Sequence, residues 1–427
     1  MPTVSGLDPL GAVLEAIRLG HGRSRAEVAH HTGLSRGLVA QRLAELIEAG
    51  LIEDAELSES TGGRPARRLH LRGEAGTILV ADIGATSIDV ALTDLEGRIL
   101  TTSQEAADVG DGPDVILGRV EQLFETLLGE SSEQWGGGAP WAIGIGVPGP
   151  VEFATGRPVS PPIMPGWNGY PVRERFVERY GVPVWVDNDV NIMALGEWRA
   201  GAARFHANMV FVKIGSGIGA GVIADGYLHR GARGSAGDVG HIQVTDDRSV
   251  VCRCGNIGCL EALAGGHALA QDAVAAAADG RSDYLAGVLA ADGEVTARDL
   301  ADGASRGDVV CQELVTRSGH LVGAMLASVV NFFNPSLIVI GGGVANAGDR
   351  LLAAVREAVY RRSLPLATRD LLILPSALGA RTGSIGAAVM VTDELFSPRH
   401  LAATLSRHPA STLGRSSMVA TIGASGR

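Results

Sequence analysis

One short stretch of the chain has the residue types of a metal site. Its candidate ligands are His241, Cys252, Cys254 and Cys259. Three soft thiolates and one imidazole suit tetrahedral zinc with no open coordination position, so the expected zinc is structural. Gly255 and Gly258 supply the bends that bring the last cysteine back to the same ion. The alternative is a set of reduced cysteines that bind nothing.

A second candidate for chemistry is the pair Asn188-Asp189, which follows the apolar strand 184–186. A strand end delivers polar groups into a cleft, and a carboxylate there can take a proton from an attacking hydroxyl. Asp189 could instead cap the helix expected over residues 190–199, and the two roles are compatible.

Two apolar segments each enter a glycine-containing turn and return as a strand. They span residues 78–92, with the turn at 84–86, and residues 210–221, with the turn at 215–217. A third apolar run, 337–340, also leads into glycines. The amides of such turns bind phosphate, although glycines also simply close hairpins. The repeat predicts a duplicated fold with an interlobe cleft. The predicted phosphate-loop residues are Asp82, Gly84, Thr86, Gly215, Ser216 and Gly217.

The N-terminal segment has the pattern of a winged helix-turn-helix. The N-caps of its three helices are Asp8, Ser24 and Ser35. Glu27 would complete a capping box with the second of these. Two short strands, 51–52 and 69–71, would flank a glycine turn at 61–63. The residues expected to face inward on the third helix are Val39, Leu43, Leu46 and Ile47.

Basic residues on this segment favour DNA binding over a plain interaction module. Arg36 and Gln41 could reach base edges, and Leu38 or Ala40 could meet thymine methyl groups. Arg64 precedes a proline, as in minor-groove insertions. The full set of predicted DNA-binding residues is Ser35, Arg36, Leu38, Ala40, Gln41, Arg42 and Arg64. The basic residues that follow the wing tip are Arg64, Arg67, Arg68 and Arg72.

Composition excludes a disordered chain and a protein that is basic throughout. The 427 residues are 46% hydrophobic and 19% charged, with 36 basic and 47 acidic side chains. The longest uncharged stretch, 318–348, raises the question of a membrane span, but Asn331 and Pro335 break it. The N-terminus has no secretory pattern, so the cytoplasm is expected. Residues 129–140 are expected to form a loop, and the tail from residue 397 to be mobile.

Motifs in order along residues 77–395 resemble the ROK family of sugar kinases and sugar-responsive repressors. They are Asp82-Ile83-Gly84-Ala85-Thr86, Gly146-Val147-Pro148-Gly149-Pro150, Asp187-Asn188-Asp189-Val190-Asn191 and Gly237-Asp238-Val239-Gly240-His241, followed by the cysteines and Glu261. The resemblance implies an actin- or hexokinase-type body of two lobes and a zinc beside the sugar pocket. It also implies that Asp189 is the catalytic base of a kinase, or a vestige of one that binds ligand. The implied sugar-binding residues are Asn188, Asp189, Asp238, His241 and Glu261.

Departures from the family pattern fall mainly on the nucleotide side. Ala85 and Ala220 replace usual glycines, and each methyl group is expected on the phosphate path or on a residue that needs a positive φ. ATP is therefore not an expected cofactor. On the sugar side, Asp238 replaces a usual glutamate and Ile163 a frequent asparagine. Trp167 could form an apolar wall under a sugar ring or be a core residue.

The sequence therefore predicts an α/β protein with a winged helix-turn-helix head and a two-lobed, sugar-kinase-like body. The expected segments are residues 1–73, 74–204, 205–396 and a flexible tail, 397–427. The predicted function is a sugar-responsive transcriptional regulator, a repressor of carbohydrate genes rather than an enzyme. Its expected partners are operator DNA, a sugar effector and a second copy in a homodimer or homotetramer, with no membrane. The alternatives are an active ATP-dependent sugar kinase carrying a DNA-binding head, and a scaffold that binds neither ligand.

Overall fold

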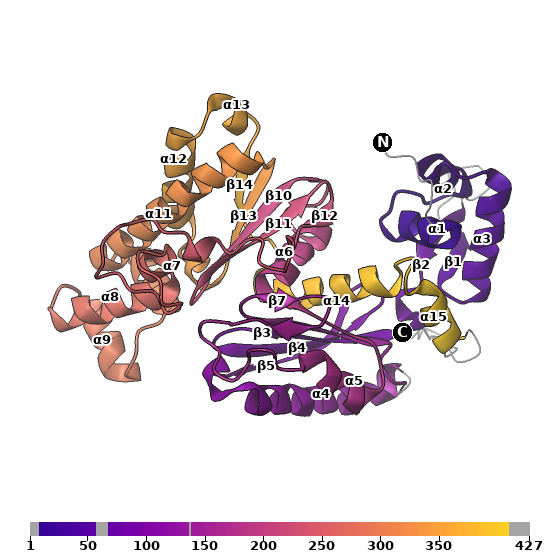
Figure 1. Cartoon of the computed structure of the whole chain (residues 1–427), viewed down its shortest axis with the longest axis horizontal. Coiled ribbons are helices and arrows are strands. Elements are labelled where there is room, and N and C mark those ends of the chain that lie inside the picture. Colours follow the sequence, from indigo (N-terminus) through magenta and orange to yellow (C-terminus); the bar gives the residue numbers. More distant parts are fainter. Residues whose placement is uncertain (1–7, 57–66, 136–137, 410–427) are drawn as a thin grey trace, which may run out of the picture.

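The computed structural model describes residues 8–56, 67–135 and 138–409. A small N-terminal head lies beside a body built from two sheets, each with its own helices (Figure 1). None of the helices in these ranges is long and apolar enough to cross a membrane.

The head contains three helices, α1 (Pro9–Arg18), α2 (Arg25–Thr32) and α3 (Arg36–Glu48). All three predicted N-caps are confirmed, because the side chains of Asp8, Ser24 and Ser35 accept hydrogen bonds from backbone amides of the first turns. The predicted capping box is only half formed. The Glu27 carboxylate accepts from the amide of Arg23 at 2.7 Å, one residue before the cap.

The helices of the head enclose a small core, and two antiparallel strands follow, β1 (Ile52–Glu56) and β2 (Arg67–Leu71). Val39, Leu43 and Leu46 are buried as predicted, whereas the prediction for Ile47 is wrong, because it is 38% exposed. Ile47 lies one residue, or about 100° around the helix, beyond the buried stripe. The predicted wing turn at 61–63 and Arg64 lie outside the described residues.

The first lobe has a five-stranded sheet in the order β5-β4-β3-β6-β9. Its strands are β3 (Thr77–Ile83), β4 (Ser87–Asp94), β5 (Ile99–Ala106), β6 (Ala142–Val147) and β9 (Val184–Asn188). A small separate hairpin consists of β7 (Val151–Glu152) and β8 (Arg157–Pro158). Helix α4 (Pro113–Trp135) covers the outer face, so the predicted loop over 129–140 is wrong up to residue 135.

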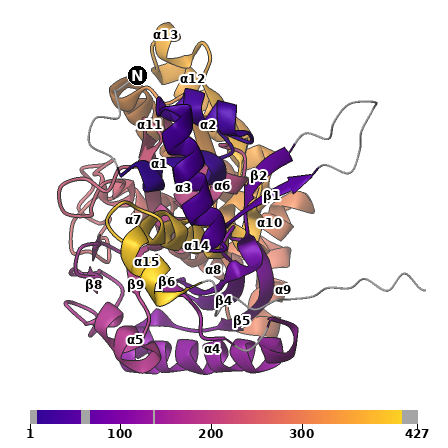
Figure 2. The ribbon, with the colours of Figure 1, turned by 90° about the vertical axis from the view of Figure 1, so that its right-hand side faces the viewer.

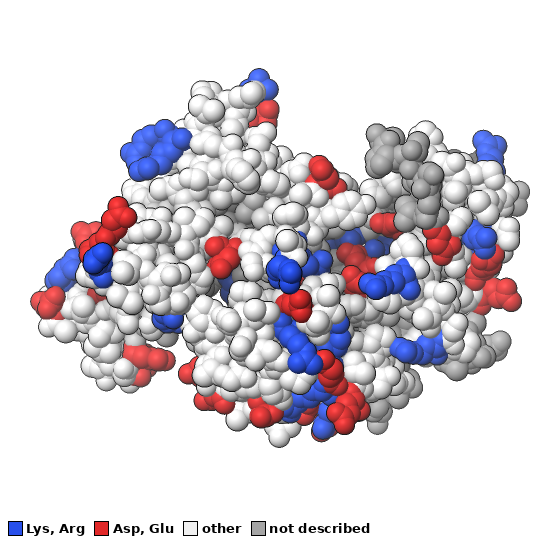
Figure 3. Space-filling model, in the orientation of Figure 1, with Lys and Arg blue, Asp and Glu red and all other residues white. Residues whose placement is uncertain are grey.

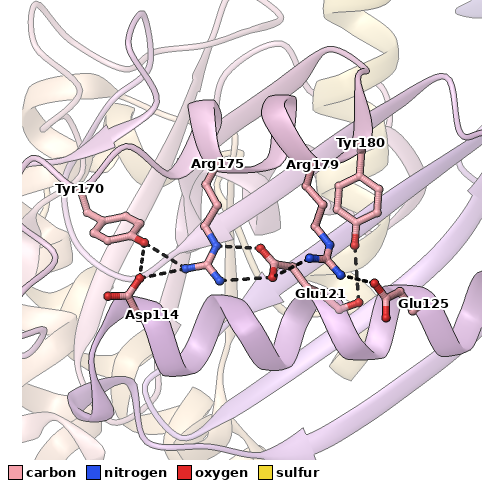
Figure 4. Close-up of polar contacts among 7 residues, drawn as sticks. All are labelled: Asp114, Glu121, Glu125, Tyr170, Arg175, Arg179 and Tyr180. Carbon is pink, nitrogen blue, oxygen red and sulfur yellow. Dashed lines mark hydrogen bonds and ion pairs between the residues drawn. The ribbon is translucent and has the colours of Figure 1, made fainter.

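Helix α5 (Val172–Tyr180) is held to α4 by a row of ion pairs (Figure 4). Arg175 contacts Glu121 at 2.7 Å and Asp114 at 3.0 Å. One turn further on, Arg179 pairs with Glu125 and with Glu121. These contacts fasten the outer helices of the first lobe and lie away from the junction between the lobes.

The second lobe repeats the first. Its sheet has the order β12-β11-β10-β13-β14, with the same relation between an antiparallel hairpin and parallel neighbours. The strands are β10 (Met209–Ile214), β11 (Ile218–Ala224), β12 (Tyr227–Leu228), β13 (Leu337–Gly341) and β14 (Leu372–Pro375). The helices are α7 (Glu261–Ala264), α8 (Gly266–Ala278), α9 (Asp283–Asp292), α10 (Ala297–Ser305), α11 (Val309–Phe333), α12 (Asp349–Arg362) and α13 (Pro365–Thr368).

Two helices from different parts of the chain lie between the sheets. Helix α6 (Asp189–Ala200) packs on β10 and β11, and α14 (Thr382–Leu395) packs on β3 and β6. They also pack tightly on each other, since a Cβ atom at Gly386 would lie 1.6 Å from the carbonyl oxygen of Ile192. Figures 1 and 2 show α14 extending from between the lobes to the head.

The chain then forms α15 (Leu401–Arg407) beside the head (Figure 2). The prediction of a flexible tail from residue 397 is therefore wrong for α15. Leu401 is fully buried, and His408 stacks on Trp141 with ring centroids 4.0 Å apart. One hydrophobic core joins the head, α6, α14 and α15. The head is thus packed onto the body rather than tethered to it.

Candidate functional site

The four predicted metal ligands lie together. The ligand atoms of His241, Cys252, Cys254 and Cys259 are all within 4.8 Å of one another. Gly255 and Gly258 have φ angles of 88° and 74°, so both predicted bends are confirmed. Burial and the neighbouring thiols raise the pKa of Cys259 to about 12. Three thiolates this close need a cation to coexist, and this donor set fits a metal ion.

The cysteine loop contacts Glu261, the first residue of α7. Arg253, between two of the cysteines, donates to one carboxylate oxygen of Glu261 at 3.2 Å. The other oxygen accepts from the amide of Ile218 at 3.0 Å and lies against Gly217, where a Cβ atom would be 2.3 Å from it. The metal cluster, a predicted sugar ligand and a predicted phosphate turn are therefore physically connected.

Asp238 and His241 lie at the same edge of the second lobe. The Asp238 carboxylate is 3.9 Å from His241 Nε2 and is partly exposed. Burial raises the pKa of Asp238, with His241 opposing the shift and Glu261 adding to it. The structure thus brings Asp238, His241 and Glu261 near one another. A cavity of about 420 Å³ opens beside the cluster, lined in part by His241, Asn256 and Cys259.

Asn188 and Asp189 mark the transition from β9 to α6. The cap of the helix is Asn188, whose Oδ1 accepts from the amides of Val190 and Asn191. Its Nδ2 donates to the carbonyl of Gly149 at 2.8 Å, which ties two of the sequence motifs together. The alternative that Asp189 is the cap is wrong, because Asp189 is already in the helix.

Sequence reasoning assigned no role to the neighbours of this pair. Asp187 is 1% exposed and binds Arg230 at 2.7 Å and Asn191 at 2.8 Å. Arg230 in turn lies 3.8 Å from the centroid of the Phe153 ring. These residues hold the strand end in place, and only the run of polar residues at 187–191 could have drawn attention to them.

The most important residue to which the sequence analysis gave no role is Lys213. Its Nζ lies 2.5 Å from Asp189 Oδ2, and it also interacts electrostatically with Asp82 and Asp89. We refer to Asp82, Asp89, Asp189 and Lys213 as the carboxylate–lysine cluster. Burial raises the pKa of Asp82 to about 7, against the opposing effect of Lys213. The signal in the sequence was that Lys213 is the only lysine of the chain, at the end of a core strand.

Each of the two turns predicted to bind phosphate is closed by a hydrogen bond from its first glycine. The amide of Gly84 donates to Ser87 O at 2.8 Å, and that of Gly215 to Gly217 O at 2.9 Å. Among the described residues, those with positive φ other than glycine are Ser160, Phe205, Asp225 and Asn334. Ala85 and Ala220 therefore need no such angle, and Ala220 lies in β11 with its side chain in the core. The argument from positive φ is therefore wrong for both alanines, and the argument from the phosphate path is wrong for Ala220; for Ala85 the phosphate-path argument stays a prediction.

Trp167, a possible sugar contact, and Ile163, a departure from the family pattern, both belong to the core of the first lobe. Trp167 is fully buried, and its Nε1 donates to the carbonyl of Val109 at 3.2 Å. Ile163 packs against the same core. Of the two alternatives for Trp167, a wall under a sugar ring or a core residue, the core residue is confirmed.

The predicted DNA-reading residues begin at the start of α3. Ser35, Arg36, Ala40 and Gln41 are exposed, whereas Leu38 and Arg42 are half-buried. Arg42 donates to both oxygens of Glu45 at 2.7 Å. Figure 3 shows acidic and basic side chains interspersed on the described part of the head in that view, so positive charge does not cover the whole head.

Comparisons with known proteins agree with this architecture. A model of the ROK family matches residues 78–394, and one of winged helix-turn-helix DNA-binding domains matches residues 11–53. A xylose repressor of Caldicellulosiruptor bescii is 30% identical over 88% of this chain and 92% of its own length.

Two solved structures extend the comparison. A ROK family transcriptional regulator, described as a homologue of the Escherichia coli MLC protein, is 27% identical with a TM-score of 0.79, covering 93% of this chain and 98% of its own. A ROK family glucokinase from Streptomyces griseus is 30% identical with a TM-score of 0.66, covering 74% of this chain and 99% of its own. This chain belongs to the ROK family.

Proposed function

We propose that the chain is a sugar-responsive, DNA-binding repressor of carbohydrate genes that acts in the cytoplasm. The single observation that carries this proposal is the packing of a winged head directly onto helices that begin at the carboxylate–lysine cluster. The xylose repressor matches over head and body, whereas the glucokinase matches the body. We take xylose and glucose as the first effectors to test.

For DNA, helix α3 would enter the major groove. Arg36 and Gln41 are exposed and would contact base edges, while Ala40 or Leu38 would meet thymine methyl groups. Ser35 and Arg42 would contact phosphates, and Arg42 would have to exchange its bond to Glu45 for a phosphate oxygen. Arg64 is expected to follow the wing.

For sugar, the proposed ligands are Asn188, Asp189, Asp238, His241 and Glu261. Zinc held by His241 and the three cysteines would be structural, because four protein ligands leave no open position. Its role would be to order the loop whose Arg253 holds Glu261. The phosphate turns would be vestigial, with ATP not bound and Asp189 serving as a ligand to the sugar.

The coupling between sugar and DNA would run through α6 and α14. Helix α6 starts at Asp189 and ends near Arg199, which bonds Asp393 of α14 at 3.0 Å. Asp393 also pairs with Arg18 of the head at 2.6 Å. A shift of α6 or α14 at the carboxylate–lysine cluster would therefore move the ion pairs that hold α1. The sugar must favour the arrangement that does not bind DNA, with a coupling free energy of about 1–3 kcal/mol.

A homodimer would place two heads on a palindromic operator with half-sites about one helical turn apart. The test begins by selecting tight-binding duplexes from a random pool with the full-length protein. Fluorescence anisotropy then measures their affinity with and without D-xylose and D-glucose. We expect nanomolar-range binding that one sugar weakens. A protein that selects no duplex would refute the DNA-binding role.

Two variants sharpen this test. Arg36→Ala should lose about 1–3 kcal/mol of discrimination between the selected duplex and random DNA. Arg68 is exposed on β2, and Arg68→Ala should weaken binding to the selected duplex and to random DNA equally. The kinase alternative keeps support from Asp189 and the glucokinase relatives. It would replace our proposal if the wild-type protein released ADP in a sugar-dependent manner at about 1–100 per second.

A further inference from the structure

One segment of the second lobe reaches across to the first lobe. It comprises residues 230–241, which follow β12 and lead to the predicted metal ligand His241, and we call it the interlobe strap. At the start of the strap, Nε of Arg230 donates to Oδ2 of Asp187 at 2.7 Å. Asp187 lies in β9 of the first lobe, so this ion pair joins the two lobes.

The Asp187 carboxylate depends on this bond for its counter-charge. The side chain is 1% exposed, and its other oxygen accepts from the amide of Asn188 and from Nδ2 of Asn191, both at 2.8 Å. These two donors are neutral, and among the described residues Arg230 is the one that forms an ion pair with Asp187. If the guanidinium moved away, a buried carboxylate would be left unpaired, which is strongly destabilising.

The guanidinium of Arg230 has a second contact in the first lobe. Its Cζ lies 3.8 Å from the centroid of the ring of Phe153, the residue that follows β7. The carbonyl of Phe153 in turn accepts from Nη2 of Arg173 in α5 at 2.6 Å. A flat guanidinium can stack on an aromatic ring while its edge bonds a carboxylate, and a lysine cannot do both. The contact is therefore specific to arginine.

Two glycines bring the backbone of the strap against both lobes. Gly234 has a φ of 88°, and a Cβ atom there would lie 2.1 Å from the carbonyl oxygen of Val151 in β7. Gly237 has a φ of 94°, and a Cβ atom there would lie 1.8 Å from the carbonyl oxygen of Ala220 in β11. The strap thus contacts the first lobe at Gly234 and the second lobe at Gly237, so a relative movement of the lobes must disturb it.

These contacts join the two chain segments that carry most of the proposed sugar ligands. The two residues that follow Asp187 are proposed ligands, and the strap carries two more, Asp238 and His241. We propose that Arg230 is a positioning residue of the sugar site, and that its bond to Asp187 holds the two segments together across the junction of the lobes. This inference deepens the proposed function and rests on it, because the sugar ligands are taken from there.

The link between the lobes is tested first without any ligand. Hydrogen–deuterium exchange of the zinc-saturated, full-length protein measures the protection of backbone amides in residues 184–191 and in the strap. Arg230→Met removes the charge but keeps an apolar stem over Phe153, and it should speed exchange at least about tenfold in both segments. Arg233→Met is the matched control, because Arg233 is exposed on the same strap and forms no ion pair among the residues that the structure describes. It should exchange as the wild type does.

Calorimetry with D-xylose and D-glucose then tests the sugar site. The sugar that the wild type binds should bind Arg230→Met at least about tenfold more weakly, since only molecules whose lobes are joined can bind it. Arg230→Lys should have an intermediate affinity, because it keeps the charge and loses the flat contact. The double variant Arg230→Met/Asp187→Asn should bind the sugar no more weakly than Arg230→Met alone. DNA affinity without sugar should stay as in the wild type, which a general loss of structure would not allow.

A folded Arg230→Met protein whose residues 184–191 exchange as in the wild type would overturn the inference, and so would an unchanged sugar affinity. If Arg230→Met does not fold, Asp187→Asn takes its place, and unchanged exchange in the strap of that variant would refute the link. A wild-type protein that binds neither sugar nor DNA would refute the proposed function, and the exchange experiment would then decide alone whether Arg230 joins the lobes.

Discussion

The hairpins β3–β4 and β10–β11 occupy the same position in their two sheets and lead into turns of the same length. The penultimate residue of the first strand is Asp82 in one lobe and Lys213 in the other. The fold makes the two positions equivalent, but their side chains are of opposite charge type, and Lys213 opposes the rise in the pKa of Asp82. In a duplicated fold, matched positions can thus carry opposite charges that interact across the junction of the lobes.

The two hairpins also differ in their supports. The second is held by Glu261, which bonds Ile218 at the start of β11 and is itself fastened by the cysteine loop. The turn of the first is closed by local contacts, such as that between Gly84 and Ser87. Stability of the second hairpin should therefore depend on the metal, and that of the first should not.

The largest effect is expected from removing a metal ligand. Cys259→Ser should lower the free energy of unfolding by about 4 kcal/mol, the range in which loss of a metal site falls. Cys311→Ala is the matched control, since this buried cysteine of α11 is outside the cluster and should keep full zinc content. Chemical denaturation and metal analysis measure both. Equal losses of unfolding free energy in the two variants would show that the metal does not stabilise the second hairpin.

The next effect should come from the matched positions themselves. Lys213→Met leaves Asp189 as an unpaired, buried carboxylate and should cost about 3 kcal/mol. Asp82→Asn removes a poorly compensated charge and should be neutral or stabilising at pH 8. Denaturation of the two variants side by side tests this. Similar destabilisation in both would mean that the hairpins do not differ in the way described.

A pH dependence should distinguish the hairpins more finely. The pKa of Asp82 is raised from 3.8 to about 7 by burial, with Lys213 opposing and Asp189 and Asp89 adding to the shift. The folded state then holds a proton that the unfolded state loses. Stability should therefore fall as pH rises from about 4 to about 7 and level off above, relative to Asp82→Asn. A flat difference between the two proteins over this range would contradict the assignment.

The smallest expected effect lies where the helices behind the two hairpins meet the head. Arg18→Gln removes the bond to Asp393 and should reduce the effect of sugar on DNA affinity by about fivefold, with sugar affinity itself little changed. Arg25→Gln, which breaks the exposed pair with Asp54, is the control. Fluorescence anisotropy gives the ratio of the DNA affinities measured without and with sugar. If this ratio is the same in Arg18→Gln as in the wild type, the coupling between sugar and DNA does not run through Arg18.

Local signals in the sequence were sufficient for the head and the metal ligands. The side chains of Asp8, Ser24 and Ser35 cap the residues that follow them, so their partners are only a few positions away. The cysteines and His241 are side chains that bind zinc, and this preference does not depend on the exact conformation of the loop. Helix α15 was missed, because its segment is rich in small and polar residues and Leu401 is buried only by the tertiary core that α15 shares with the head, α6 and α14.

The sequence by itself determined the caps of the head helices, the strands that enter the two glycine turns and the residue types that can bind a metal, because these depend on neighbours along the chain. Only the tertiary structure decided what Lys213 does. Its partner Asp189 lies 24 positions away and belongs to the other lobe, so nothing local indicates the contact. Tertiary packing likewise decided that Ala220 points into the core, since a side chain's face depends on the strand's register and not on the motif.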